Sequence, residues 1–296
     1  MNRRQAITAL ASTAAAAAAG TQLGAQTTAG KKRRIKQSFF TRAFATGPNQ
    51  PKISFEDMVA VGKRLGAFGF DMVPQTQWPI LKQNGMICCI GSGGGVAIET
   101  GIIHKEMHDE MAKTLEAFID QCAANGVPSI LIAGGQKKGL SISEGTANAL
   151  TFLNRMKGHA EEKGVNLCLE IMNDKYTNPS IGRVDQIGNH IDWVADVVSK
   201  VNSPRVKILF DIYHVQVMDG NVAEHIKQYM PLIGHFHTAG VPGRHELDEN
   251  QELNYRYIFQ TIADLGYQGY VAHEYDPTAG KDPVQLIEKV FAVADV

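Results

Sequence analysis

Eight short apolar runs, separated by longer segments with helical periodicity, fill the chain from residue 35 to residue 296. The runs are typical of strands: IKQSFF (35–40), GFDMVP (69–74), MICCIG (86–91), SILIAG (129–134), NLCLEIM (166–172), VKILFDI (206–212), GHFHTAG (234–240) and GYVAHEY (269–275). Segments such as 111–126, 149–164, 254–266 and 283–294 place apolar residues three and four apart, as a buried helix face does. Eight strands, each followed by a segment of helical length, predict an α/β fold: a single-domain (β/α)8 TIM barrel.

An open, doubly wound sheet is the alternative arrangement of the same elements. That fold carries a GxGxxG turn after its first strand, whereas the glycine-rich run GSGGG (91–95) follows the third strand here. The run also lacks the Lys-Ser/Thr ending of a phosphate-binding loop. These features favour the barrel, and they predict that 91–95 forms a flexible loop at the active site.

Composition narrows the range of partners. The apolar fraction of 44% and the charged fraction of 20% are ordinary for a soluble globular protein. A net charge of −1 gives no electrostatic reason to expect a nucleic acid or an acidic membrane. No stretch after residue 25 is long and apolar enough to span a bilayer. We therefore expect a small-molecule substrate, with a homo-oligomer left open.

The N-terminus has the three-part layout of a secretory signal. A short basic start with the pair Arg3-Arg4 precedes an Ala-rich run, and small residues lie near Ala25. The arginine pair predicts a signal of the twin-arginine type over residues 1–25 and export to the periplasm. Residues 26–34, which include KKRR, are then a linker, and 35–296 form the barrel. An Ala-rich tail on a cytoplasmic protein is the alternative.

The four cysteines do not form a recognisable framework. Cys88 and Cys89 are adjacent, Cys168 lies in an apolar run, Cys122 lies on a helix-like segment, and no CxxC pair occurs. Zinc-finger and thioredoxin interpretations therefore have no support. We expect buried structural thiols.

The last four strand-like runs each carry a metal-ligating type of residue near their end. These residues are Glu170, Asp211, His237 and Glu274. In (β/α)8 barrels the active site lies at the carboxyl ends of the strands, and an unpartnered carboxylate there would be costly. We expect the four side chains to converge on one divalent cation. Three carboxylates and one imidazole suit Mn²⁺ or Mg²⁺, with Co²⁺ as a further candidate.

The other histidines receive different interpretations. We assign only one of His235 and His237 to the barrel interior, and we expect His273 to face the opposite side from Glu274. His104 and His108 are four residues apart at a helix start, but the HEXXH pattern is absent. A solvated helix face is the prediction for that pair.

Several motifs in the second half of the chain carry a family resemblance. The runs LEIMND, FDIYHVQ, HFHTAGVPGRHE, ELNY and HEY, in this order and spacing, resemble the hydroxypyruvate isomerase family. That family belongs to the xylose isomerase-like barrels, as do ketose 3-epimerases and endonuclease IV, and the resemblance covers residues 35–296. It implies that Glu170 and Glu274 are both metal ligands and the acid/base pair, with Asp211 and His237 completing the metal site. It also implies substrate contacts from His214, Arg244, Asn173, His245 and Glu246.

The resemblance implies an isomerase that converts hydroxypyruvate to tartronate semialdehyde through an enediolate. A ketose 3-epimerase is an alternative, because many hydroxypyruvate isomerases carry Gln at the position of His237 and the epimerases carry His. An exported lyase or hydratase on oxidised sugars is another alternative. A non-catalytic sugar-binding protein would not require both glutamates, and a nuclease would require His ligands that the first three strand ends lack. Arg244 would hold a substrate carboxylate, or else form a loop salt bridge with Glu246 or Asp248.

Overall fold

The structure is a computed structural model, and it describes residues 34–48, 50–96, 98–175, 177–178 and 182–296. The predicted signal segment, 1–25, and linker residues 26–33 lie outside the described residues, so the signal and the export route stay predictions. The described part of the chain falls within one unit, Arg33–Val296.

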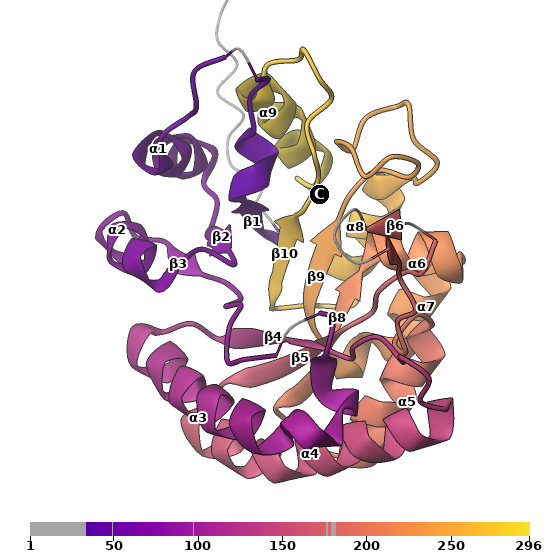
Figure 1. Ribbon diagram of the computed structural model, residues 1–296. Coiled ribbons are helices and arrows are strands. Elements are labelled where there is room, and N and C mark those ends of the chain that lie inside the picture. Colours follow the sequence, from indigo (N-terminus) through magenta and orange to yellow (C-terminus); the bar gives the residue numbers. More distant parts are fainter. Residues whose placement is uncertain (1–33, 49, 97, 176, 179–181) are drawn as a thin grey trace, which may run out of the picture. The chain divides into compact units, whose positions relative to one another are not determined.

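Eight parallel strands form the centre of the protein (Figure 1). They are β1 (Lys36–Phe40), β2 (Gly69–Asp71), β3 (Ile87–Cys88), β4 (Ser129–Ala133), β5 (Asn166–Glu170), β8 (Val206–Asp211), β9 (Ile233–Thr238) and β10 (Tyr270–His273). Their order in the sheet is β3-β2-β1-β10-β9-β8-β5-β4. A bridge between Gly91 and Ile130 joins the two edges, so the strands close into a barrel. All eight predicted strands and the predicted barrel are confirmed.

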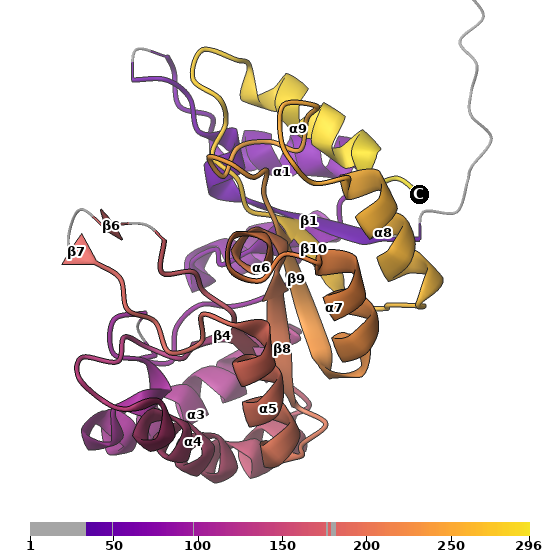
Figure 2. The ribbon, with the colours of Figure 1, turned by 90° about the vertical axis from the view of Figure 1, so that its right-hand side faces the viewer.

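Helices lie around the outside of the strands (Figures 1 and 2). They are α1 (Phe55–Leu65), α2 (Trp78–Gln83), α3 (His108–Asn125), α4 (Ile142–Lys163), α5 (Ile191–Val201), α6 (Ile212–Met218), α7 (Val222–Tyr229), α8 (Tyr255–Asp264) and α9 (Pro283–Val293). Short 3-10 helices are η1 (Thr41–Phe44), η2 (Gln75–Gln77), η3 (Gly101–Ile103), η4 (Lys105–Met107) and η5 (Met230–Leu232). Within the described ranges, no helix combines the length and apolar character that crossing a bilayer requires.

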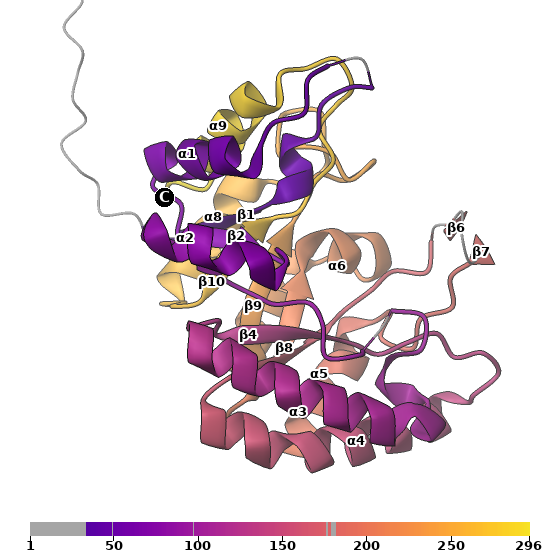
Figure 3. The ribbon, with the colours of Figure 1, turned by 60° about the vertical axis from the view of Figure 1, so that its left-hand side comes forward.

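One small antiparallel hairpin interrupts the βα pattern. It consists of β6 (Thr177–Asn178) and β7 (Gly182–Arg183), between β5 and α5. Figures 2 and 3 show it projecting away from the helices. The hairpin therefore extends the loop that follows β5, the strand that carries Glu170.

Local sequence signals set the helix ends. At the start of α4, the Ser141 hydroxyl accepts a hydrogen bond from the backbone N–H of Glu144, and the Glu144 carboxylate accepts one from the backbone N–H of Ser141. This capping box satisfies two N–H groups that the helix itself leaves without partners. α4 ends at Gly164, whose φ of 71° lies in the left-handed region that glycine adopts without steric cost. Gly126 ends α3 in the same way.

A small apolar cluster fills the barrel interior below the ends of the strands. It contains Ile90, Leu131, Cys168 and Leu209. Residues two apart in a strand point to the same side, so Cys168 and Leu209 lie one layer below Glu170 and Asp211. The strand ends therefore rest on a packed layer of side chains. A larger apolar core that includes Phe70 fills the space between the strands and the helices.

The cysteines are buried and free, as predicted. Burial raises the pKa of the Cys88, Cys122 and Cys168 thiols to about 12, so they stay protonated at neutral pH. A buried neutral thiol is a small apolar group and a poor nucleophile.

In the segment after β3, the structure contradicts one prediction and leaves the predicted flexibility of the glycine-rich run untested. His104 and His108 are buried and bind the carbonyl oxygens of Gln136 and Ile102, so the prediction of a solvated face is wrong. The glycine-rich run packs against α3: a Cβ atom added to Gly94 would lie 2.7 Å from a methyl carbon of Leu115. Glycine is therefore required at position 94 because a larger side chain would clash with α3.

Candidate metal and catalytic site

The four predicted metal ligands come together at the carboxyl ends of neighbouring strands. Glu170 ends β5, Asp211 ends β8, His237 lies in β9 and Glu274 directly follows β10. Each of them offers a ligand atom, and these four atoms all lie within 4.8 Å of one another. All four residues are buried. The sheet order brings strands from distant parts of the sequence side by side, and it produces the cluster.

Asp211 has a structural role that accounts for a carboxylate at the end of an apolar strand. Its Oδ1 atom accepts hydrogen bonds from the backbone N–H groups of Tyr213 and His214 at 2.8 and 3.4 Å, so Asp211 is the N-cap of α6. The other oxygen, Oδ2, faces the cluster and lies 3.2 Å from Nη2 of Arg244. One residue therefore starts the helix and contributes an oxygen to the site.

The imidazole of His237 lies at the centre of the cluster. Its Nδ1 atom is 2.9 Å from Oε2 of Glu274 and 3.4 Å from Oε1 of Glu170. The Phe40 ring packs edge-on against it with a centroid distance of 4.9 Å. Burial alone would lower the pKa of His237, but Glu274 and Asp71 together raise it well above the ordinary value.

Two arginines neutralise Glu274. Nη2 of Arg244 lies 2.9 Å from Oε2 of Glu274, and Nη2 of Arg42, from η1, lies 3.6 Å from Oε1. Burial alone would raise the pKa of Glu274, but Arg244 and His237 hold it below its ordinary value. The alternative pairing of Arg244 with Glu246 or Asp248 is wrong. Those two carboxylates instead contact Lys281, at 2.8 and 3.5 Å.

His214 is held in one tautomer beside Asp211. Its Nδ1 atom accepts hydrogen bonds from the backbone N–H of Asn173 at 3.1 Å and from the side-chain amide of Asn173 at 2.7 Å. The ring proton is therefore on Nε2, which lies 3.3 Å from Oδ2 of Asp211. Burial and the nearby Arg244 charge lower the pKa of His214 to about 3, so the ring is neutral. The site thus contains a neutral N–H donor at the rim of the carboxylate cluster.

The structure brings three of the five predicted substrate-contacting residues to the cluster: Asn173, His214 and Arg244. His245 and Glu246 have other partners. The carbonyl oxygen of Asp276 contacts Nδ1 of His245 at 2.8 Å. Glu246 accepts hydrogen bonds from the backbone of Thr278 and from Lys281. The substrate contacts implied for all five residues remain predictions.

Three polar residues of the site were missed from the sequence: Asp71, His235 and Arg42. Asp71 ends β2 as Asp211 ends β8, and this shared position was the signal that could have identified it. The assignment of only one histidine of β9 to the interior is wrong. His235 and His237 are two residues apart, so both point to the same side, and both lie against Asp71.

His273, by contrast, faces the helices, as predicted. It lies on β10 next to Glu274, and its ring nitrogens contact Thr238 and Gln37. Burial lowers its pKa to about 3, which keeps the ring neutral. This histidine therefore belongs to the packing outside the barrel.

The donor set fits a divalent cation. Nδ1 of His237 and Oε2 of Glu274 are buried and make no hydrogen bond of good geometry among the described residues, although each has an ionisable neighbour at 2.9 Å. Such atoms are costly unless something binds them, and both face the centre of the cluster. Oxygen donors from Glu170, Asp211 and Glu274 with one imidazole nitrogen match Mn²⁺, Mg²⁺ or Co²⁺.

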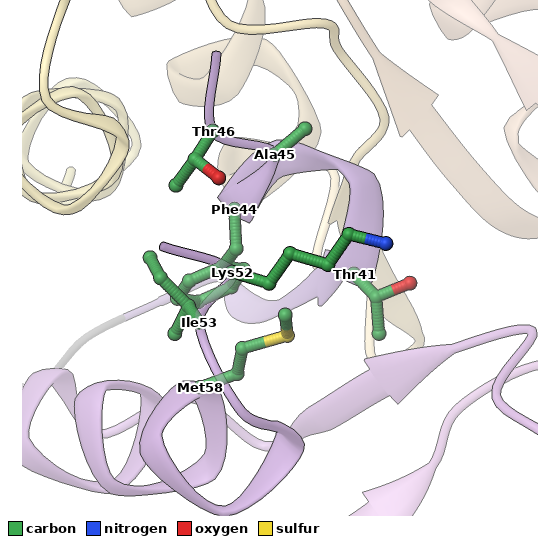
Figure 4. A pocket seen from close by; sticks show the side chains of 7 residues that line it. All are labelled: Thr41, Phe44, Ala45, Thr46, Lys52, Ile53 and Met58. Carbon is green, nitrogen blue, oxygen red and sulfur yellow. The ribbon is translucent and has the colours of Figure 1, made fainter. Parts of the chain in front are cut away.

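A separate shallow pocket lies beside the end of β1. Figure 4 shows the residues that line it, which are Thr41, Phe44, Ala45, Thr46, Lys52, Ile53 and Met58. The lining is largely apolar, with one amine and two hydroxyl groups. It includes none of the residues of the carboxylate cluster, so we do not assign the chemistry to this pocket.

Comparison with known families gives one match over most of the chain. Residues 78–292 match the model of the family described as xylose isomerase-like TIM barrel. Among solved structures, 3-keto-D-glucoside 4-epimerase from E. coli superposes with a TM-score of 0.70 and 18% identity, covering 87% of this chain and 98% of that one. At this identity the superposition demonstrates the fold alone.

Curated relatives match shorter stretches. A protein of Xenopus laevis named "Putative hydroxypyruvate isomerase" is 39% identical over 130 residues, which are 43% of this chain and 46% of the relative. A 2-oxo-tetronate isomerase of Cupriavidus necator is 44% identical over 84 residues, 28% of this chain and 32% of the relative. The chain spans less than two thirds of the length of the curated relatives that it matches.

Proposed function

Because the chain belongs to the xylose isomerase-like TIM barrel family, we propose that it is a divalent-metal-dependent isomerase acting on hydroxypyruvate. The observation that carries the proposal is the cluster of Glu170, Asp211, His237 and Glu274. In this cluster two glutamates lie next to one imidazole. Such a site can bind a metal ion, and its glutamates can serve as an acid/base pair. The named relatives, hydroxypyruvate and 2-oxo-tetronate isomerases, support the reaction type.

The reaction moves one proton between carbons and one between oxygens, so it needs no oxidant or reductant. A glutamate carboxylate takes a proton from C3 of hydroxypyruvate, the C–H electrons form the C2–C3 double bond, and the carbonyl electrons move to the C2 oxygen. A glutamate then returns a proton to C2 of this enediolate. The hydroxyl proton passes from the C3 oxygen to the C2 oxygen, and the product is tartronate semialdehyde. A divalent cation held by Glu170, Asp211, His237 and Glu274 would supply Lewis-acid polarisation of the substrate carbonyl.

Glu170 and Glu274 are the two candidates for the base. They come from β5 and β10, which are separated in the sheet by β8 and β9, so they approach the cluster from different sides. Two carboxylates on different sides of one substrate allow one to remove a proton and the other to return it.

Arg244 and His214 would orient the substrate. A guanidinium presents paired N–H donors, which match the carboxylate that hydroxypyruvate carries. The neutral His214 has its N–H on Nε2, so it donates a hydrogen bond to a substrate oxygen and does not add charge. Together they would fix which carbon faces each glutamate.

Epimerisation of a ketose at C3 is the second candidate function. His237 favours it, because the family resemblance noted in the sequence implies a His at that position in the ketose epimerases. The same glutamates would serve, with the proton returned to the opposite face of the same carbon. A lyase or hydratase acting on oxidised sugars would share the enediolate step, so the product decides between these reactions.

Deuterium incorporation tests the proposal. Purified protein loaded with Mn²⁺ or Mg²⁺ is incubated in D₂O with hydroxypyruvate and, separately, with a panel of ketoses, and NMR follows each carbon. We expect metal-dependent deuterium next to the carbonyl of hydroxypyruvate, and tartronate semialdehyde as the product. Exchange only with ketoses would favour the epimerase, and no exchange with any of these compounds would contradict the proposed function.

We also propose that the chain is exported by the twin-arginine route. The pair Arg3-Arg4 ahead of the Ala-rich run supports this. Replacing both arginines by lysine preserves the charge and should leave the precursor in the cytoplasm. Equal periplasmic amounts of the two forms on fractionation would contradict the route.

A further inference from the structure

A second buried polar cluster lies beneath the candidate metal site. Asp71 at the end of β2, Ser38 in β1 and His235 in β9 point into the barrel, and each has an exposed fraction of at most 1%. No step of the proposed reaction uses them. A carboxylate so deeply buried is destabilising unless its hydrogen bonds are satisfied, so the cluster requires an explanation.

The donor and the acceptor can be assigned in each hydrogen bond of Asp71. Oδ1 accepts a hydrogen bond from the Ser38 hydroxyl at 2.8 Å. Oδ2 is 2.6 Å from Nε2 of His235 and 3.3 Å from Nε2 of His237. An ionised carboxylate accepts hydrogen bonds and donates none. In each of these two contacts Nε2 of the imidazole is therefore the donor and Asp71 is the acceptor.

The orientation of the ring decides which nitrogen of His237 faces the metal ligands. With Nε2–H directed at Asp71, the other nitrogen, Nδ1, is directed at Glu170 and Glu274, at 3.4 and 2.9 Å. A histidine that binds a metal through one nitrogen commonly donates its other N–H to a carboxylate, which fixes the tautomer and the ring orientation. Asp71 and His237 have this geometry.

We propose that Asp71 is a positioning residue that presents Nδ1 of His237 to the divalent cation. The inference rests on the proposed function, since it needs a metal at the cluster. Asp71 acts by accepting the His237 Nε2 proton, while Ser38 and His235 hold the Asp71 carboxylate in place. The Phe40 ring, packed edge-on against the imidazole, limits its rotation.

A second cation bound by Asp71, His235 and His237 is the competing interpretation. The ligand atoms of this trio also lie within 4.8 Å of one another. Such a cation would displace the Nε2 protons that now face Asp71. Metal stoichiometry separates the two interpretations, because the positioning role predicts one cation for each chain.

Asp71→Asn tests the proposal. The change keeps the size of the side chain but replaces one acceptor oxygen by an amide donor, so the hydrogen bond from His237 is weakened or lost. Ser38→Ala is the matched control, because it removes the donor to the other oxygen of Asp71 and leaves Oδ2 in place. Circular dichroism first establishes that both variants fold.

The affinity for Mn²⁺ and the protonation of His237 are the two readouts. We expect Asp71→Asn to raise the Kd for Mn²⁺ by about 10–100-fold, the usual effect of losing an outer-shell partner, and Ser38→Ala to raise it less. In ¹⁵N-labelled wild-type protein loaded with Mg²⁺, NMR should detect the His237 proton on Nε2 and none on Nδ1. This second readout needs no variant, so it holds even if Asp71→Asn does not fold.

The outcomes separate this inference from the proposed function. Folded Asp71→Asn with wild-type Mn²⁺ affinity, a proton on Nδ1 of His237, or two bound cations for each chain would overturn the positioning role. Metal binding that depends on Asp71, with no deuterium exchange on any substrate, would overturn the proposed function alone. A wild-type protein that binds no Mn²⁺ would overturn both.

Discussion

Nη2 of Arg244 lies 2.9 Å from Oε2 of Glu274, inside the set of residues that we assign to a divalent cation. The same nitrogen lies 3.2 Å from Asp211. A buried group of carboxylates is unstable without positive charge, and the arginine supplies part of that charge. Its φ of 59° is unusual for a residue other than glycine, and the loop after β9 adopts it where the guanidinium reaches the site.

Arg244→Lys should impair substrate binding more than turnover. Lysine keeps the charge but loses the paired donors that match a carboxylate. We expect the KM for hydroxypyruvate to rise by about one to two orders of magnitude, because a charged hydrogen bond is worth ~1.5–3 kcal/mol. Steady-state kinetics measure this, with Arg64→Lys at a surface ion pair as the control. An unchanged KM would remove Arg244 from substrate binding.

Glu170→Gln and Glu274→Gln should each abolish most of the proton transfer. Glutamine is similar in size but neither accepts nor returns a proton, and general acid–base catalysis contributes about 10²–10⁴-fold. We expect kcat to fall by that range in each variant, measured with metal at saturation. Glu224→Gln on α7, whose carboxylate pairs with Lys227 at the surface, is the matched control. Near wild-type kcat in either site variant would exclude that glutamate as an essential acid or base.

The sequence predicted the four ligands more readily than their surroundings. Glu170 and Asp211 follow apolar runs, so their positions at strand ends were visible in the pattern. Asp71 was not found because the predicted run 69–74 extends past it and hides its place at the end of β2, and Arg42 lies in η1, which acquires its neighbours only when the barrel closes. The predicted loop partners of Arg244 were wrong for a related reason. Glu246 is near it in sequence, but Asp211 and Glu274 are near it in space.

Adding Mn²⁺ should stabilise the wild-type protein against heat. A ligand that binds only the folded state adds about 2.7 kcal/mol at a concentration 100 times its Kd. We expect Tm to rise in differential scanning calorimetry, and an excess of chelator to reverse the rise. His237→Ala removes one ligand and should shrink the shift at equal Mn²⁺. An equal shift in both proteins would mean that the stabilising ion binds elsewhere.

Ser141→Ala should destabilise the fold and leave the chemistry intact. The change removes the hydroxyl half of the capping box at the start of α4, where Glu144 supplies the other half. An N-cap substitution of this kind costs about 1 kcal/mol, so the midpoint of urea unfolding should fall with no change in kcat. Thr151→Ala is the control within the same helix: its hydroxyl bonds the backbone of Ala147 in the helix interior, where alanine is the better helix former. A loss of stability in Thr151→Ala as large as in Ser141→Ala would show that the capping box is not the cause.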